Sequence, residues 1–203
     1  MDLLADPIVH IVDDQPGMLK MLSELLNSVA LTPVLYSSAH HFLDRYVPRE
    51  RECLISDVRM PEIGGLEFFR LIRERGYSLP VLFITGYAEV GTAVEAMKAG
   101  AFDYIEKPFS HQAFIDKVEQ ALVVSVGLHR DSARRRAVQA RLSLLTPTEQ
   151  KILSLVTQGK SSRDIGDEMG ISSRTVENHR GRLMDKLHVN SVVELVLIFA
   201  GNS

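Results

Sequence analysis

The sequence of 203 residues contains a single cysteine, no tryptophan and no long hydrophobic run. The lone Cys53 excludes an internal disulfide, and its position within an apolar run indicates a small buried side chain in a reducing compartment. No apolar run approaches the ~18 residues of a membrane span, and the N-terminus lacks the basic start of a signal peptide. We therefore expect a cytoplasmic protein without a membrane segment.

The composition is not that of a disordered protein, and the net charge is small. Hydrophobic residues make up 45% and charged residues 24%, as in globular proteins with cores, and the length suits two domains. The net charge of -3 conceals an asymmetry: residues 1–124 hold 11 Lys+Arg against 18 Asp+Glu, and residues 125–203 hold 12 against 8. The second part therefore suggests an anionic partner.

All of that positive excess lies in residues 125–145. Residues 125–145 hold five arginines and one aspartate, whereas residues 146–203 balance seven positive against seven negative charges. Nucleic-acid binding by the C-terminal segment must therefore depend on where its charges lie.

Short apolar runs alternate with segments of amphipathic helical spacing in the first half. The runs are residues 8–12, 33–36, 53–56, 80–84 and 103–105. Near-continuous apolar strands separated by helices predict an α/β fold, a doubly wound five-stranded parallel sheet with helices on both faces. Helices are expected to begin after Ser38 and after Ser110.

The pattern changes to short capped helices at residue 146. Thr146, Pro147 and Glu149 suit the N-cap, N1 and N3 positions of a first helix, which ends near Gly159. Three further helix starts follow, at Ser161 with Asp164, at Ser172, and at Ser191 with Glu194. They predict a small all-α domain of four helices, in which a tight turn at Gly170 joins the second and third as a helix-turn-helix.

The segment between the two halves has no proline and one glycine across residues 121–145. Its apolar residues keep an approximately helical spacing, which favours a helical extension of the fifth helix. The alternative is an arginine-rich solvated linker.

Polar residues follow the predicted strands at one edge of the sheet, where ligands bind in doubly wound folds. Asp13, Asp14 and Asp57 end two strands, Thr85 ends a third and Lys107 follows the last. Clustered carboxylates repel one another unless a hard cation such as Mg2+ lies among them. A hydroxyl and an ammonium group beside them complete a site for a phosphoryl group.

Four segments then carry a resemblance to a known family: HIVDD (10–14), ISDVRMPEIGG (55–65), ITG (84–86) and DYIEKPF (103–109). Over residues 6–124 the chain resembles the flavodoxin-like receiver domain of bacterial two-component response regulators, which a sensor histidine kinase phosphorylates on an aspartate. The resemblance implies that Asp57 is the phosphoacceptor and that Lys107 contacts the phosphoryl oxygens. It further implies that Thr85 and Tyr104 act as a switch, and that Asp13, Asp14, Asp57 and the backbone carbonyl of Arg59 hold Mg2+.

Two other functions share parts of this pattern. Phosphohydrolases of the haloacid dehalogenase class also use a strand-end aspartate and Mg2+, but carry a second aspartate two residues later, where this chain has Arg59. We therefore expect no enzyme activity. A receiver that serves only as a protein-interaction surface would not need the intact five-residue site.

The C-terminal segment LTPTEQ to KLHV, residues 145–189, resembles the LuxR-type effector domain of the NarL/FixJ regulators, over residues 142–203. Residues 125–141 would then be a helical linker. The resemblance implies that the helix at about residues 173–186 enters the major groove of promoter DNA. We therefore expect a transcription regulator whose partners are a histidine kinase, double-stranded DNA and RNA polymerase.

The helical count separates two faces of this third helix, with Val176, Leu183, Met184 and Leu187 inward. Asn178 and Gly181 lie opposite, where Asn178 suits adenine and Gly181 permits close approach. The remaining predicted DNA contacts are Lys160, Arg174, Thr175, Glu177, Arg182 and Lys186. Arg180 falls on the inward side and is expected to pair with Glu149 or Asp164.

Glu177 allows two interpretations at the edge of the reading face. It forms a helical ion pair with Arg174 or Arg180, or it accepts a hydrogen bond from a cytosine amino group. Because one near-neutral binding domain would bind weakly, two copies are expected on paired half-sites. The predicted phosphorylation-dependent dimer uses the face of the fourth helix and fifth strand, including Val90, Val94 and Met97.

Overall fold

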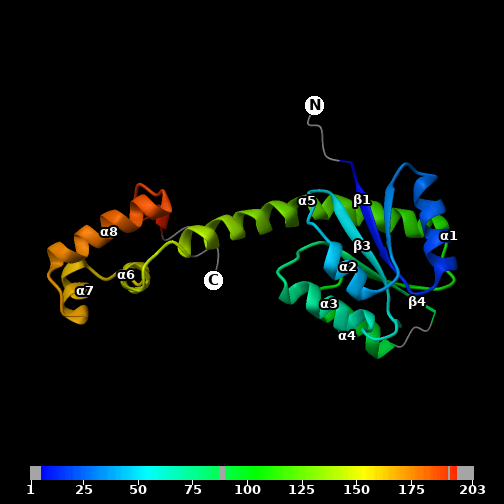
Figure 1. Ribbon diagram of the computed structural model, residues 1–203, viewed down its shortest axis with the longest axis horizontal. Helices are drawn as coiled ribbons and strands as arrows, with labels where there is room; N and C mark the ends of the chain where they lie inside the picture. The colour runs from blue at the N-terminus through cyan, green and yellow to red at the C-terminus, as the bar shows by residue number, and fades with distance from the viewer. Residues whose placement is uncertain (1–5, 87–89, 192, 196–203) are drawn as a thin grey trace. The chain divides into compact units, whose positions relative to one another are not determined.

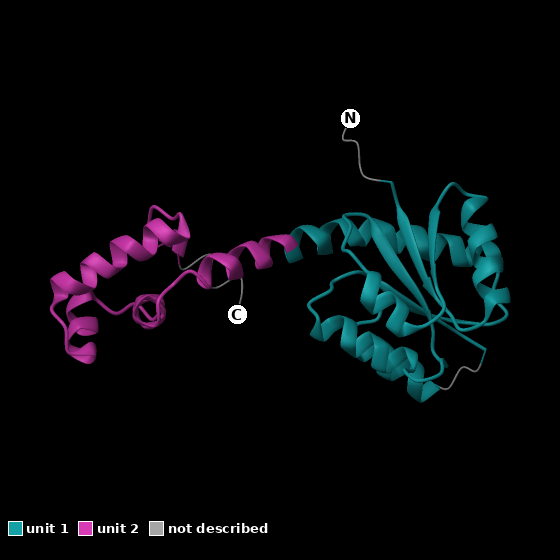
Figure 2. Cartoon of the chain, in the orientation of Figure 1, with its two compact units in different colours: residues 1–132 teal, residues 133–203 magenta. Residues whose placement is uncertain are grey.

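The computed structural model describes residues 6–86, 90–191 and 193–195, which belong to two compact units, residues 1–132 and 133–203 (Figure 2). Five parallel strands form the sheet of the first unit in the order β2-β1-β3-β4-β5. Their bounds are β1 (Ile8–Val12), β2 (Thr32–Tyr36), β3 (Glu52–Asp57), β4 (Val81–Thr85) and β5 (Asp103–Glu106). The predicted doubly wound sheet is confirmed.

Helices cover both faces of this sheet (Figure 1). They are α1 (Pro16–Asn27), α2 (Ala39–Arg45), α3 (Gly65–Glu74), α4 (Val90–Lys98) and α5 (His111–Leu142). One core lies between the sheet and helices α1 and α5, and the other lies between the sheet and α2, α3 and α4. Strand β3 is buried along its whole length, so its apolar residues run continuously.

The expected helix starts at Ser38 and Ser110 are confirmed. The Ser38 hydroxyl oxygen accepts a hydrogen bond from the backbone N–H of His41 at 3.1 Å, and Ser110 accepts one from Ala113 at 3.3 Å. These side chains satisfy backbone donors that the first helical turn leaves without partners.

A buried polar network that the sequence analysis did not predict ties α5 to β3. His10 Nε2 lies 3.0 Å from Glu52 Oε2, and the Tyr46 hydroxyl donates to Glu52 Oε1 at 2.5 Å. The backbone N–H of Glu52 donates to the Ser125 hydroxyl of α5 at 3.1 Å. Burial in α5 continues to Ser132, and the first unit accordingly includes residues 125–132.

The second unit contains α6 (Pro147–Thr157), α7 (Ser162–Met169) and α8 (Ser173–Leu187), which pack around a shared apolar core. The expected capping box of Thr146 with Glu149 is present, and the expected helix start at Ser161 with Asp164 is also a capping box. At Ser191, the hydroxyl oxygen accepts a hydrogen bond from the Glu194 N–H at 3.1 Å. The predicted fourth helix is described only at residues 193–195; most of it lies outside the described residues. No helix in the described part of the chain is long and apolar enough to cross a membrane.

The turn between α7 and α8 depends on glycine at two positions. Gly170 ends α7 with a φ of 68°, a left-handed conformation that favours glycine. A Cβ at Gly166 would lie 2.7 Å from the backbone oxygen of Ile171, so only glycine permits this close approach. The two glycines together allow α8 to pack against α7 as a helix-turn-helix.

Candidate functional site

Asp57 lies at the C-terminal end of β3 with its carboxylate almost fully buried. Lys107 Nζ, beyond the end of β5, lies 3.0 Å from Asp57 Oδ1 and 3.7 Å from Asp13 Oδ2. The backbone N–H of Arg59 donates to Asp57 Oδ2 at 2.9 Å. The fold therefore brings two carboxylates and one ammonium group together at the predicted edge.

Asp13 is the second buried carboxylate of this cluster. Burial raises its pKa, assisted by the negative charges of Asp57 and Asp14, while the Gln15 backbone N–H and Lys107 oppose that rise. The Gln15 N–H donates to Asp13 Oδ1 at 2.8 Å. Asp14 is exposed. Within the described residues, no three or more His, Cys, Asp or Glu side chains are arranged to hold a metal ion.

A pocket of about 270 Å³ opens beside Asp57. Its lining residues are Gln15, Met18, Asp57, Arg59, Thr85, Gly86 and Lys107. Thr85 is buried at the end of β4, and its backbone oxygen accepts a hydrogen bond from the Lys107 N–H at 2.7 Å. Four of the predicted residues, Asp57, Arg59, Thr85 and Lys107, thus line one pocket.

Gly65, the first residue of α3, shapes the same edge. A Cβ at this position would lie 2.5 Å from the backbone oxygen of Asp57 and 2.9 Å from the Cα of Val58. Glycine therefore lets the start of α3 approach the end of β3, and this contact restrains the backbone that carries Asp57.

Tyr104 lies apart from the pocket lining. It is partly buried on β5, and its ring centroid lies 6.4 Å from that of Phe83 on β4. Sequence reasoning missed Gln15 and Met18, which reach the pocket from the start of α1. Neither residue type suggests phosphate chemistry, and only the fold brings them to the site.

The predicted core stripe of α8 is confirmed. Val176, Leu183 and Leu187 are buried, and Met184 packs against the same core. The opposite face is exposed at Arg174, Asn178, Gly181 and Asp185, and Arg182 beside it is exposed as well. Thr175 is partly buried, and its backbone N–H donates to the Ser172 side chain that caps α8.

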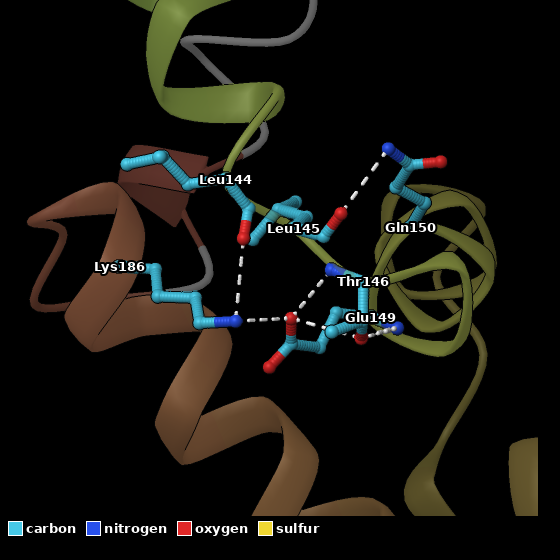
Figure 3. Close-up of polar contacts among 6 residues, drawn as sticks. All are labelled: Leu144, Leu145, Thr146, Glu149, Gln150 and Lys186. Atoms are coloured by element: carbon cyan, nitrogen blue, oxygen red, sulfur yellow. Dashed lines mark hydrogen bonds and ion pairs between the residues drawn. The ribbon is translucent and has the colours of Figure 1, made fainter.

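Two long basic side chains have partners that the sequence did not predict. Lys186 Nζ donates to Glu149 Oε2 at 2.7 Å and to the backbone oxygen of Leu144 at 3.3 Å (Figure 3). Arg180 instead donates to the Ser162 hydroxyl at 2.6 Å, so its predicted pairing with Glu149 or Asp164 is wrong. Lysine reaches Glu149 because the end of α8 packs beside the start of α6, which a helical count does not reveal.

Glu149 is the centre of this contact. Its Oε2 also accepts hydrogen bonds from the Thr146 backbone N–H at 2.8 Å and from the Thr146 hydroxyl at 3.0 Å (Figure 3). Hydrogen bonds from Lys186 and Thr146 lower the Glu149 pKa to about 2. The carboxylate that caps α6 therefore also fixes the end of α8.

Glu177 contacts residues of its own unit. Its Oε1 accepts a hydrogen bond from the Ser162 hydroxyl and lies 3.6 Å from Arg180 Nη1. Lys160 likewise pairs with Glu168. These contacts favour the ion-pair interpretation of Glu177.

Replacing Glu177 with alanine is expected to leave base preference unchanged and to tighten DNA binding slightly. The substitution removes a negative charge near the reading face and an ion pair worth only a few tenths of a kcal/mol. Selection of bound duplexes from a random pool, followed by affinity measurements, checks both effects. Loss of preference at one C·G position would assign Glu177 to a cytosine contact instead.

The sheet with its acidic edge and lysine, followed by a helix-turn-helix unit, defines a class: a phosphorylation-controlled DNA-binding protein. Residues 9–119 match the family described as response regulator receiver domain, and residues 143–199 match bacterial regulatory proteins, luxR family.

Relatives match over nearly the whole chain. "Transcriptional regulatory protein FixJ" of Azorhizobium caulinodans is 39% identical, with 93% of this chain and 89% of that protein covered. FixJ of Rhizobium meliloti is 37% identical, covering 95% of each. Among solved structures, the response regulator StyR has a TM-score of 0.66 at 33% identity, covering 97% and 99% of the two chains. Full-length FixJ from B. japonicum has a TM-score of 0.58 at 32% identity, covering 98% of each.

The chain therefore belongs to the NarL/FixJ family of two-component response regulators and acts as a transcription regulator. Its receiver domain implies a histidine kinase as partner, and its LuxR-type domain implies DNA binding. Receiver domains of response regulators generally use Mg2+ for phosphorylation.

Proposed function

We propose that Asp57 accepts a phosphoryl group from a histidine kinase and that this modification controls how α8 binds promoter DNA. The receiver (residues 6–124) would act through the linker (125–141) on the DNA-binding domain (142–203). The observation that carries the proposal is the position of Lys107 Nζ, 3.0 Å from Asp57 and 3.7 Å from Asp13, beside a pocket at the C-terminal edge of the sheet.

Each side chain at the pocket has a distinct part in the transfer. An Asp57 carboxylate oxygen attacks phosphorus, and the bond between phosphorus and the kinase histidine nitrogen breaks as that nitrogen leaves. Lys107 neutralises charge on the phosphoryl oxygens, and the Arg59 N–H holds Asp57 Oδ2 in place. Thr85 then approaches the phosphoryl group from the end of β4 and Tyr104 follows, which biases the α4 and β5 face between two states.

The donor set beside Asp57 suits Mg2+. Asp13 and Asp57 are buried oxygen donors that share one neutralising ammonium group, so a divalent cation would relieve their repulsion. Asp13, Asp14, Asp57 and the Arg59 carbonyl would hold the ion, which would neutralise phosphoryl oxygens when bound. Because Arg59 occupies the place of the second aspartate of the dehalogenase-type hydrolases, we propose no enzyme activity.

The proposed DNA surface is the exposed face of α8 with the turn before α7. Asn178 reads a base edge, Gly181 permits close approach, and Arg174 and Arg182 contact phosphates, with Thr175 beside them. Lys160 of the turn before α7, whose ion pair with Glu168 lies at the surface, is proposed as a further phosphate contact. Lys186 is left out, because Glu149 and the Leu144 carbonyl engage its ammonium group.

Phosphorylation is proposed to pair two copies through α4. Val90, Val94 and Met97 are exposed at 79%, 45% and 46%, so this helix presents an apolar surface to solvent. Two copies would bind paired half-sites more tightly than one, which compensates for a near-neutral binding domain. RNA polymerase is the partner proposed for the promoter-bound dimer.

Acetyl phosphate tests the proposal on the wild-type chain. With Mg2+ present, intact mass is expected to rise by one phosphoryl group, and analytical ultracentrifugation is expected to show a dimer. Addition of EDTA should prevent both changes. Failure to gain a phosphoryl group contradicts the assignment of the site, whereas phosphorylation without a change in sedimentation contradicts only the dimer.

A further inference from the structure

The last third of α5 is a basic helix within the second unit. Residues 133–142 include four arginines and no acidic residue; the last fully buried residue of α5 is Ser132, and Leu142 packs, partly buried, against the core of the second unit. A helical segment that buries little apolar surface and carries adjacent like charges gains little stability from packing or from ion pairs. We therefore expect these arginines to interact with a partner outside their own helix.

One of these arginines joins the helix to α8. The Arg141 guanidinium donates to the backbone oxygen of Leu187, the last residue of α8, at 3.4 Å. Arg134 lies seven residues earlier, about two helical turns, and so shares the face of α5 that carries Arg141. The basic face thus continues from the end of the proposed DNA-reading helix.

Arg134 and Arg135 are exposed, and neither forms a hydrogen bond or ion pair with any residue that the structure describes. Arg136 differs, because it does have an interaction. Two cationic side chains are therefore available to an anionic partner, within about two helical turns of the Arg141 that contacts the end of α8.

The distribution of charge identifies that partner. Residues 146–203 balance seven basic and seven acidic residues, so the net positive charge of the second unit comes from the arginines of α5. Duplex DNA is a dense polyanion, and neutralising its phosphates supplies sequence-independent affinity. The helices α6 to α8 cannot supply this through net charge.

We propose that Arg134 and Arg135 contact phosphates of the bound DNA beside the groove that α8 reads. The linker helix is then part of the DNA-binding surface in addition to connecting the two units. This inference rests on the proposed placement of α8 in the groove, and it assigns these contacts to affinity and not to base recognition.

The test compares the full-length R134Q/R135Q variant with wild type, both phosphorylated, on the duplex that wild type selects and on a random duplex. The slope of log K against log salt should fall by about 0.9 for each lost phosphate contact of each bound copy. Affinity should fall several-fold on both duplexes, with base preference unchanged. Arginine and glutamine have similar helix propensities, so α5 should keep its helicity, as circular dichroism can verify.

Two further variants complete the design. R134K/R135K keeps both charges and should restore most of the slope. K20Q/R45Q makes the same change in net charge on exposed side chains of α1 and α2, and should leave the slope at its wild-type value.

An unchanged slope in R134Q/R135Q would overturn the inference. Tighter DNA binding by that variant would overturn it too, because the arginines would then dock on an acidic protein surface that competes with DNA. If wild type itself binds no selected duplex, the proposed function of α8 fails as well. If wild type binds the selected duplex and R134Q/R135Q shows the same slope as wild type, only the linker contact fails.

Discussion

Replacing Asp57 with asparagine is expected to abolish phosphoryl uptake and to hold DNA affinity at the level of the unphosphorylated protein. An amide is far less nucleophilic than a carboxylate, and asparagine closely matches aspartate in shape. Its side-chain oxygen can still accept a hydrogen bond from Lys107 or from the Arg59 N–H. The expected loss is therefore chemical, and thermal stability should stay near that of wild type.

Intact mass after incubation with acetyl phosphate and Mg2+ measures the first effect. DNA affinity with and without acetyl phosphate measures the second, since the ratio of the two affinities should fall to one in the variant. Asp44→Asn is the matched control, because Asp44 is an exposed carboxylate on α2 away from the pocket. Phosphoryl uptake by the Asp57 variant at the wild-type rate would place the acceptor elsewhere.

The sequence predicted the elements of the receiver because each is marked locally. Strand β3 is buried on both faces, and its central residues Cys53, Leu54 and Ile55 are accordingly apolar before Asp57, where the sheet edge begins. Parallel strands end at one edge, so the predicted fold was sufficient to expect Asp57 near Lys107, fifty residues away. No local sequence pattern identifies Gln15 and Met18 as pocket residues, because any polar or apolar residue can line a pocket rim.

Partners of long side chains in the second unit were harder to predict. A helical count correctly assigned Arg180 to the inward side, but Arg180 contacts Ser162 because α7 lies beside it. The sequence also identified Glu149 as the N3 residue of a capping box. It could not show that the same oxygen meets Lys186, because that contact depends on how α6 and α8 cross.

The contact between Lys186 and Glu149 reduces the number of basic side chains of α8 that are available to DNA phosphates. With Lys186 held by Glu149 and Arg180 held by Ser162, the exposed arginines of α8 are Arg174 and Arg182. A domain with few available cations gains more from additional phosphate contacts than a strongly basic one does. The linker arginines therefore become more significant once Lys186 is assigned to the interior contact.

Lys186→Met is expected to destabilise the second unit by about 2 kcal/mol, because the buried Glu149 carboxylate loses its ammonium partner. The value is discounted because about a third of the Lys186 side chain is exposed to solvent. Urea unfolding read from the methyl resonances of Leu153 and Leu183 measures the loss. These resonances are needed because the chain has no tryptophan and its tyrosines all lie in the first unit. Lys151→Met, an exposed change on α6, is the control and should cost little.

The same contact predicts how stability depends on pH. The Glu149 pKa is about 2 in the folded protein and near 4.5 in the unfolded chain. The ionised Glu149 carboxylate therefore stabilises the fold above about pH 4.5, and this stabilisation is lost as pH falls toward 2. In Lys186→Met this pKa should rise, so the variant should lose less stability than wild type over that interval. Glu149→Gln should make the free energy of unfolding depend less on pH over the same interval. The double variant should lose less stability than the sum of the losses in the two single variants. Equal pH profiles for wild type and Lys186→Met would show that the ammonium group does not stabilise the Glu149 carboxylate.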